Sequence, residues 1–184
     1  MVAYDATAQV WLISTLALGG QTSRLPVSRS PDGFRWSAPA DAATAVSADG
    51  IAFDKNWLAC DNGAGSRFRG SCYLVYTDVL RNDRLAVVTS RDGGRTWSLP
   101  TGVPVTGAVG AFPVIRPNGD LVLLFLWNGR RIGAAVSTDG AVTFGEPALV
   151  ADVQARRARG LRLFTLPAAD VDPTGRVWGT WHDC

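Results

Sequence analysis

Short runs of alternating apolar and polar residues follow one another along the chain, and Gly, Pro, Asn and Asp interrupt them about every eight to twelve residues. No stretch carries a convincing helical period. The pattern therefore predicts an all-β fold. The expected strands are Val10 to Leu18, Leu25 to Arg29, a strand from Ser37, Trp57 to Asp61, Cys72 to Asp78, Leu85 to Ser90, a strand after Trp97, Gly110 to Ile115, Leu121 to Trp127, Ile132 to Ser137, a strand after Phe144, Leu166 to Val171, and Val177 to Asp183.

One short segment recurs three times between expected strands. Residues 90–97 read Ser-Arg-Asp-Gly-Gly-Arg-Thr-Trp, residues 137–144 read Ser-Thr-Asp-Gly-Ala-Val-Thr-Phe, and residues 30–36 form a copy that is one residue shorter. Such a segment predicts a hairpin turn in which the aspartate accepts bonds from turn amides, glycine supplies a positive φ, and the aromatic ring packs between strands. We assign a structural role to Ser30, Asp32, Trp36, Ser90, Asp92, Gly94, Trp97, Ser137, Asp139 and Phe144.

The motif Ser-x-Asp-x-Gly-x-Thr-Trp at residues 90–97 resembles the Asp-box, or bacterial neuraminidase (BNR) repeat, of the sialidase superfamily. Residues 53–59 and 73–78 also resemble secreted bacterial members of that superfamily. The resemblance covers essentially the whole chain. It implies a sialidase-like β-propeller with four strands per blade and the Asp turn between the third and fourth strands. Asp-boxes also occur in other glycosidases, photosystem assembly factors and sorting receptors, so the resemblance bears on fold more than on activity.

Sialidase-like propellers have six blades, whereas the strands here make two complete units and two partial ones. We expect a single incomplete propeller domain of about three blades' worth, truncated at both ends, with blade remnants at residues 1–50, 51–106, 107–153 and 154–184. A smaller closed propeller and an open half-ring are the alternatives.

Composition narrows the classes of partner. The chain has 184 residues, 47% of them hydrophobic, and a net charge of +2, so it can bury a core but shows no electrostatic footprint for nucleic acid. The longest apolar run, Val10 to Leu18, is too short to cross a membrane and is interrupted by Ser14 and Thr15. No Lys or Arg precedes it, so we do not interpret it as a signal segment. The expected partner is a glycan or glycoconjugate, and unpaired blade edges would favour self-association.

The sialidase chemistry uses three arginines that clamp the substrate carboxylate, an aspartate acid/base, and a tyrosine nucleophile paired with a glutamate. Glu146 is the only glutamate, and it follows an Asp-box aromatic by two residues, where an exposed strand residue is expected. Residues 114–117, Val-Ile-Arg-Pro, do not reproduce the family's Arg-Ile-Pro segment. No catalytic residue can therefore be assigned, and we expect no sialidase activity from this chain alone. A sialidase-type glycoside hydrolase and a non-catalytic propeller that binds carbohydrate or protein at the cell surface both remain open.

Topology predicts where ligands would bind. In a propeller, the loops that join second to third strands and the connections between blades share one face, opposite the Asp-box turns. That face would carry Asp54, Lys55, Asp78, Arg81, Asn82, Asp83, Asn128, Arg130, Arg131, His182 and Asp183, together with the loop containing Arg156, Arg157, Arg159 and Arg162. Arginines beside carboxylates suit an acidic, polyhydroxylated sugar. The alternative is that Asp78, Asn128 and Asp183 only end strands by bonding turn amides.

The cysteines indicate the compartment. Cys60, Cys72 and Cys184 match no zinc spacing, His182 is the only histidine, and each Asp turn offers one carboxylate, so we expect no metal and no cofactor. Cys60 ends one expected strand and Cys72 begins its antiparallel neighbour, which predicts a disulfide between them. Cys184 would pair outside this chain. A disulfide implies a secreted or cell-surface protein.

Overall fold

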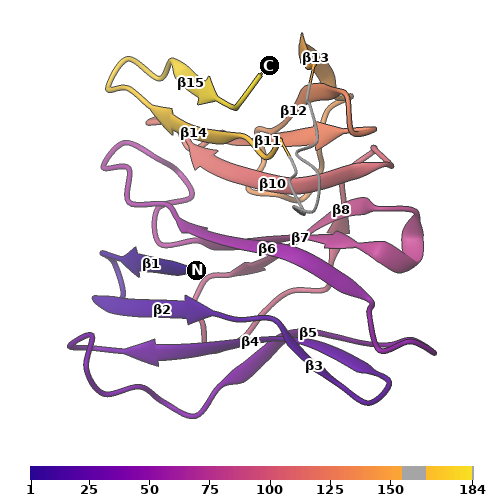
Figure 1. The fold of residues 1–184 in the computed structure, drawn as a ribbon. Helices are drawn as coiled ribbons and strands as arrows, with labels where there is room; N and C mark the ends of the chain where they lie inside the picture. The colour runs from indigo at the N-terminus through magenta and orange to yellow at the C-terminus, as the bar shows by residue number, and fades with distance from the viewer. Residues whose placement is uncertain (155–164, 184) are drawn as a thin grey trace.

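The computed structural model describes residues 1–154 and 165–183, and Figure 1 shows its strands. The described part of the chain is all-β apart from one 3-10 turn, η1 (Val79–Arg81). The strands are β1 (Val2–Asp5), β2 (Val10–Ser14), β3 (Ala17–Gly19), β4 (Thr22–Ser30), β5 (Ala40–Val46), β6 (Phe53–Cys60), β7 (Cys72–Asp78), β8 (Arg84–Ser90), β9 (Thr101–Gly102), β10 (Ala108–Ile115), β11 (Leu121–Trp127), β12 (Arg131–Ser137), β13 (Ala148–Asp152), β14 (Ala168–Val171) and β15 (Val177–Thr180). The all-β prediction is confirmed.

The strands form four antiparallel sheets in chain order. Sheet I runs β1-β2-β4 with β3 and β5 also paired to β4, sheet II runs β6-β7-β8-β9, sheet III runs β10-β11-β12-β13, and sheet IV is β14-β15. The first strands of successive sheets lie side by side: β6 packs beside both β1 and β10, and β10 beside β14 (Figure 1). The first strands of all four sheets therefore lie on one side of the molecule, and the later strands of each sheet extend away from that side.

Sheet I differs from the expected pattern at its start. The alternation of hydrophobic residues does not predict β1, yet Val2–Asp5 pairs with β2 from Val2↔Ile13 to Asp5↔Val10. Sheet I, expected to be one of the two partial units, therefore begins with a strand that the sequence did not predict. The sequence signal is weak because Asp5 is the only buried residue of β1, and a polar one. The expected strand from Val10 to Leu18 is also two strands, β2 and β3, each paired to β4.

Apolar side chains from facing sheets fill the space between them. One cluster, including Leu12, Leu25 and Leu74, lies between sheets I and II, and a second, including Val87 and Phe125, lies between sheets II and III. A smaller cluster joins sheets III and IV. The second strands of sheets II and III, β7 and β11, are buried on both faces for six consecutive residues each. That burial explains why they are continuous apolar runs rather than alternating ones.

The second and third Asp turns are held by the same internal hydrogen bonds. In the second, Ser90 Oγ donates to Asp92 Oδ1 (2.8 Å) and accepts from the Gly94 amide (2.8 Å), while Asp92 Oδ1 accepts from the amides of Arg95 and Thr96. The third turn repeats these bonds with Ser137 and Asp139 as acceptors and the amides of Ala141, Val142 and Thr143 as donors.

The first Asp turn departs from the other two. Ser30 Oγ accepts from the Gly33 amide, three residues on instead of four, because this copy is one residue shorter. We expected its aromatic ring to pack between strands, and this is wrong for Trp36, which is 39% exposed. Trp97 and Phe144 of the other two turns do pack against the core clusters.

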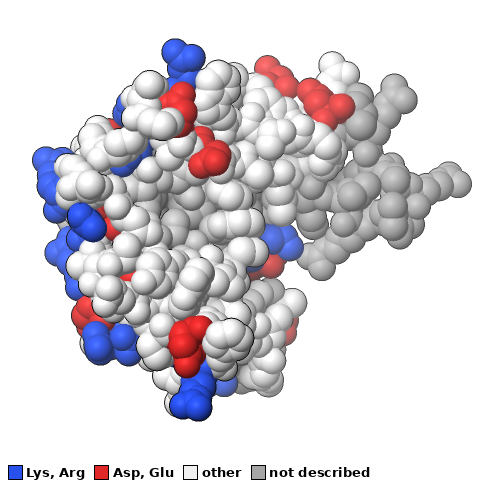
Figure 2. All heavy atoms as spheres, turned by 90° about the vertical axis from the view of Figure 1, so that its left-hand side faces the viewer, with Lys and Arg blue, Asp and Glu red and all other residues white. Residues whose placement is uncertain are grey.

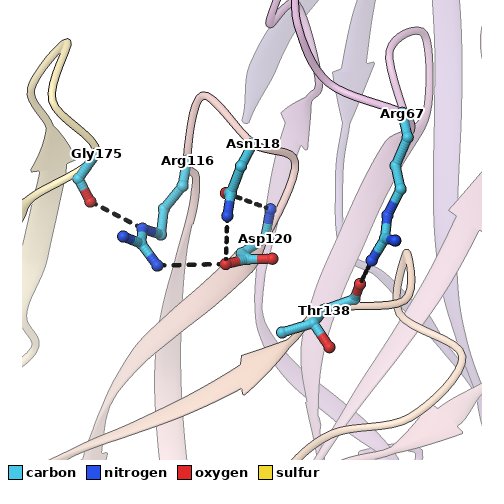
Figure 3. Close-up of polar contacts among 6 residues, drawn as sticks. All are labelled: Arg67, Arg116, Asn118, Asp120, Thr138 and Gly175. Carbon is cyan, nitrogen blue, oxygen red and sulfur yellow. Dashed lines mark hydrogen bonds and ion pairs between the residues drawn. The ribbon is translucent and has the colours of Figure 1, made fainter.

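Further contacts join neighbouring sheets at the edge that carries the Asp turns (Figure 3). Arg116, between β10 and β11, donates from Nε to the Gly175 carbonyl oxygen of sheet IV (2.8 Å) and pairs through Nη1 with Asp120 Oδ2 (3.2 Å). Arg67, in the loop between β6 and β7, donates to the Thr138 carbonyl oxygen of sheet III. At the base of that loop Cys60 and Cys72 form the predicted disulfide, directly opposite one another in register. No helix in the described residues is long and apolar enough to cross a membrane.

Candidate functional site

The sheet edge opposite the Asp turns holds most of the predicted site residues. This edge, called the hairpin edge here, comprises the β7–β8 turn with the strand ends beside it (78–84), the β11–β12 turn with its strand ends (127–131), the linkers between sheets (47–52 and 103–107) and the start of β6 (53–55). Four of its residues adopt positive φ without being glycine: Lys55 (53°), Asn82 (57°), Asp83 (51°) and Asn128 (51°). Asn and Asp tolerate this region, and such conformations concentrate at functional sites.

Backbone hydrogen bonds bring the turns of sheets II and III together at the hairpin edge. The Gly107 amide donates to the Asn82 carbonyl oxygen (2.9 Å), and the Ala108 amide donates to that of Asp83 (2.9 Å). The Asn128 amide donates to the Gly107 carbonyl oxygen (2.7 Å). A Cβ on Gly107 would lie 2.1 Å from Asn128 Oδ1, so glycine is needed there. Asn82, Asp83 and Asn128 therefore occupy one continuous strip.

A bulge in the first strand of sheet II displaces Lys55. The pairing of β6 with β7 shifts register between Asp54 and Trp57, which leaves Lys55 and Asn56 outside the ladder. Asp54 accepts from the Lys55 amide (2.8 Å), and its Oδ2 lies 3.6 Å from Lys55 Nζ. Asn56 Nδ2 donates to Oγ of the buried Ser14 (3.0 Å). Bulges re-aim side chains next to binding sites, and sequence reasoning missed Asn56, whose only signal is the broken alternation.

Two of the arginines predicted for the site, Arg81 and Arg131, form ion pairs with nearby aspartates. Arg81 Nε lies 3.6 Å from Asp78 Oδ2, and Arg131 Nε lies 3.2 Å from Asp152 Oδ1. These arginine side chains are more than half exposed, so the pairs contribute little to stability. Arg130 is exposed, and within residues 1–154 and 165–183 no carboxylate lies within ion-pair distance of it.

The two residues predicted near the C-terminus bond to the chain segments around them. Asp183 Oδ1 accepts from the Gln154 amide (2.8 Å), and His182 Nε2 lies 3.0 Å from Thr165 Oγ1. Asp183 thus caps the segment that follows β13, the role given by the turn-bonding alternative. The arginines expected in the intervening loop, Arg156, Arg157, Arg159 and Arg162, lie outside the described residues.

The described tyrosines of β7 are poorly placed to act as nucleophiles. Burial, reinforced by the charge of Asp78, raises the pKa of Tyr76 to about 12. Burial also raises the pKa of Tyr73. Both phenols therefore stay protonated at neutral pH. Glu146 is exposed just after the third Asp turn, so it is not positioned to take a proton from either phenol.

Comparison with known proteins supports the fold. No protein-family model matches the chain, and no curated protein matches it. Among solved structures, the Hadza microbial sialidase Hz136 is 16% identical with a TM-score of 0.65, over 99% of this chain and 41% of that one. The α-L-arabinofuranosidase of Fusarium graminearum, in complex with arabinobiose, is 14% identical with a TM-score of 0.64, over 93% and 53%.

A third similar structure is the intramolecular trans-sialidase from Ruminococcus gnavus in complex with oseltamivir carboxylate. It is 20% identical with a TM-score of 0.54, over 71% of this chain and 27% of that one. The chain thus spans about half or less of the length of these enzymes. At such low identity the likeness shows the fold alone: antiparallel sheets arranged as in propeller enzymes of glycan metabolism.

Proposed function

We propose that this chain is part of a six-bladed sialidase-type propeller, a glycoside hydrolase of the exo-α-sialidase (neuraminidase) class that engages glycans at the hairpin edge. The observation that carries the proposal is the arrangement of the sheets. Their first strands lie side by side, and all three Asp turns lie on the edge opposite the hairpin edge. Solved sialidases share this arrangement over up to 99% of the chain. Sheets I, II and III would be three blades and sheet IV the inner half of a fourth.

The chemistry of the hairpin edge suits an acidic sugar. Asp78 and Asp83 offer carboxylate acceptors for sugar hydroxyls, and Arg130 offers a planar donor pair for a carboxylate. Asn82 and Asn128 add amide groups that both donate and accept. The backbones of Asn82, Asp83 and Asn128 are held by hydrogen bonds to the linker between sheets II and III. The positions of these residues would therefore be set before a ligand binds.

The buried tyrosines favour a second candidate, a non-catalytic Asp-box propeller that binds carbohydrate or protein at a cell surface. Tyr73 and Tyr76 stay protonated, and Glu146 lies at the wrong edge. The described part of the chain thus offers no tyrosine activated by a glutamate. In the hydrolase candidate the nucleophile pair would come from other blades. The Cys60–Cys72 disulfide supports secretion in both cases, because such bonds persist in oxidising compartments.

A glycan microarray probed with the purified 184-residue protein tests the shared part of the proposal. We expect binding to glycans that end in an acidic sugar, and a loss of about tenfold in affinity for Arg130→Ala and Asp78→Asn. Asp183→Asn should matter less, because its carboxylate already caps the Gln154 amide. Glu146→Gln, an exposed carboxylate near the opposite edge, is the matched control. Full binding by all three variants, with the fold intact, would show that the hairpin edge is not the site.

Turnover separates the two candidates. We expect no release of fluorophore from a 4-methylumbelliferyl sialoside by this chain, since removing a nucleophile pair costs many orders of magnitude in rate. Release by the product of the complete gene would favour the hydrolase. Glycan binding without release by that product would favour the non-catalytic candidate. Release by the 184-residue chain itself would overturn our expectation.

A further inference from the structure

The Asp-turn edge carries a hollow of about 520 Å³ between sheets I and II. Arg67 and Arg69 line it from the loop between β6 and β7, and Arg91 and Arg95 line it from the second Asp turn. The β1–β2 turn, with Thr7, closes the other side. Figure 2 views this edge and shows Lys and Arg side chains gathered along its left side. We call this feature the arginine hollow.

The arginine hollow has more positive charge than its own carboxylates neutralise. Within the described ranges 1–154 and 165–183, none of its four arginines lies within 4.0 Å of a carboxylate oxygen. Arg67 donates to the Thr138 carbonyl oxygen and Arg95 to that of Asp92, while the side chains of Arg69 and Arg91 make no hydrogen bond in the described part of the chain. Arg69 and Arg91 therefore present unpaired guanidinium groups to the solvent in the hollow.

The two carboxylates of the hollow, those of Asp5 and Asp92, accept hydrogen bonds from groups of their own turns. Asp5 is buried, and its Oδ1 accepts from the amides of Thr7 (2.9 Å) and Ala8 (3.0 Å). Asp92 accepts from the Thr96 hydroxyl and from two turn amides. Burial raises the pKa of Asp92, but its hydrogen bonds outweigh that effect and lower it to about 2, so it remains an ionised acceptor.

The walls of the hollow are held in place. The loop that carries Arg67 and Arg69 is closed at its base by the Cys60–Cys72 disulfide, and the Gly70 amide donates to the Asp61 carbonyl oxygen (2.8 Å). The ring of Phe68 packs so closely on Gly140 that a Cβ there would meet it at 2.9 Å. On the opposite wall, Arg29 Nε donates to the Gly93 carbonyl oxygen (2.5 Å) and fastens the second Asp turn to sheet I. A ligand would therefore meet arginines on backbones that need no rearrangement.

We propose that the arginine hollow is a second ligand site, which binds the carboxylate or sulfate group of an acidic polysaccharide between Arg69 and Arg91. Planar guanidinium groups bind such oxyanions through paired N–H donors. We favour a sugar over a nucleic acid because the Thr7 hydroxyl in the lining can exchange hydrogen bonds with sugar hydroxyls. The site lies at the opposite edge from the one proposed above, so it does not depend on that proposal.

Calorimetric titration of the 184-residue protein with defined hexasaccharides tests this site. The probes are a sulfated heparin hexasaccharide, a carboxylated galacturonate hexamer, neutral maltohexaose and a single-stranded DNA hexamer. We expect one or both acidic sugars to bind, maltohexaose not to bind, and the preferred sugar to identify the anionic group. The variants Arg69→Ala and Arg91→Ala should each weaken binding about tenfold.

Arg24→Ala and Arg35→Ala are the matched controls, because they remove the same charge from exposed arginines that lie outside the hollow and outside the hairpin edge. They should leave acidic-sugar binding within about twofold of the unmodified protein. Arg69 and Arg91 are exposed, and their side chains make no hydrogen bond within the described residues, so their variants should keep the melting temperature. Equal loss in all four variants, no binding of either acidic sugar, or tighter binding of DNA than of both sugars would overturn the assignment.

Discussion

The Gly107 carbonyl oxygen accepts a 2.7 Å hydrogen bond from the Asn128 amide, and this bond ties the linker between sheets II and III to the β11–β12 turn. Gly107 has a φ of +65°, and the space where its Cβ would lie is taken by Asn128 Oδ1 at 2.1 Å. The position thus combines two demands that only glycine meets. It is also where Asn82, Asp83 and Asn128 converge.

Gly107→Ala should destabilise the protein by about 1–3 kcal/mol, since it adds both a strained φ and a clash with Asn128. Urea denaturation gives the change in the free energy of unfolding. Gly65→Ala is the control, because a Cβ there meets nothing within 4 Å and its φ is not positive. Adding Asn128→Gly to Gly107→Ala should restore part of the loss by removing the clash. Equal stability of the Gly107→Ala and Gly65→Ala variants would contradict the packing described here.

Asp92→Asn should lower stability at neutral pH by about 1–2 kcal/mol, because the carboxylate accepts several charge-assisted bonds in the second Asp turn. Those bonds hold the pKa of Asp92 at about 2 in the folded chain, against an ordinary value of 3.8. A lowered pKa stabilises the fold fully above pH 3.8, and this contribution is lost as the pH falls toward 2. Thermal unfolding should therefore depend less on pH in this window for the variant.

Asp41→Asn is the comparison for that experiment, since it removes an exposed carboxylate that pairs with Arg24 at 3.6 Å and holds no turn. It should change the neutral-pH melting temperature little. If Asp92→Asn and Asp41→Asn shift the acid unfolding curve alike, the Asp turn does not have the stabilising role we give it.

Replacing Cys60 and Cys72 together by serine should cost about 3 kcal/mol, because the disulfide closes a loop whose ends are 12 residues apart. Unfolding in guanidinium chloride measures the loss. Alkylation of the unreduced protein followed by mass analysis counts the free thiols: we expect one label, on Cys184, and none in a Cys184→Ser variant. Three labels on the unmodified protein would show that the bridge does not form.

The described chain should self-associate through the outer edge of sheet IV. Within the described residues β15 pairs only with β14, and Trp178 of β15 is 58% exposed. Exposed strand edges pair with other chains, and lysine on such an edge opposes this. Sedimentation velocity should show association that grows with concentration and weakens in Trp178→Lys. Leu99→Lys is the control, because Leu99 is 89% exposed but lies outside the strands. A strictly monomeric protein at all concentrations would refute the prediction.

The sequence predicted the secondary structure more completely than it predicted the candidate site. The bounds of β7 and β11 were predictable to the residue, because apolar runs of this length end at polar turn residues. The Asp turns were predictable for the same reason, since Ser, Asp and the turn amides that bond them lie within four residues of one another. Trp36 was not, because its exposure depends on what lies beyond its own short turn.

The arginine hollow has no signal in the linear sequence. Its arginines come from two loops about twenty residues apart, and Thr7 lies far from both. The sequence around Arg67 and Arg91 does not distinguish them. Yet Arg67 donates to the Thr138 carbonyl oxygen of the next sheet, whereas the side chain of Arg91 makes no hydrogen bond in the described part of the chain. The same holds at the hairpin edge, where the contact between Gly107 and Asn128 depends on how sheet II packs against sheet III.

By itself, the sequence determined the all-β class, the Asp turns and the Cys60–Cys72 pairing, because each depends on residues that are close along the chain or opposite in one hairpin. Only the tertiary structure decided that β1 completes sheet I, that Asn56 anchors to Ser14, and which arginines remain unpaired. The strand β1 was missed because its only buried residue is polar, whereas the Asn56 contact and the unpaired arginines arise where separate sheets meet. Contacts between sheets depend on the packing of the apolar clusters among them, and no periodicity within a single strand encodes that packing.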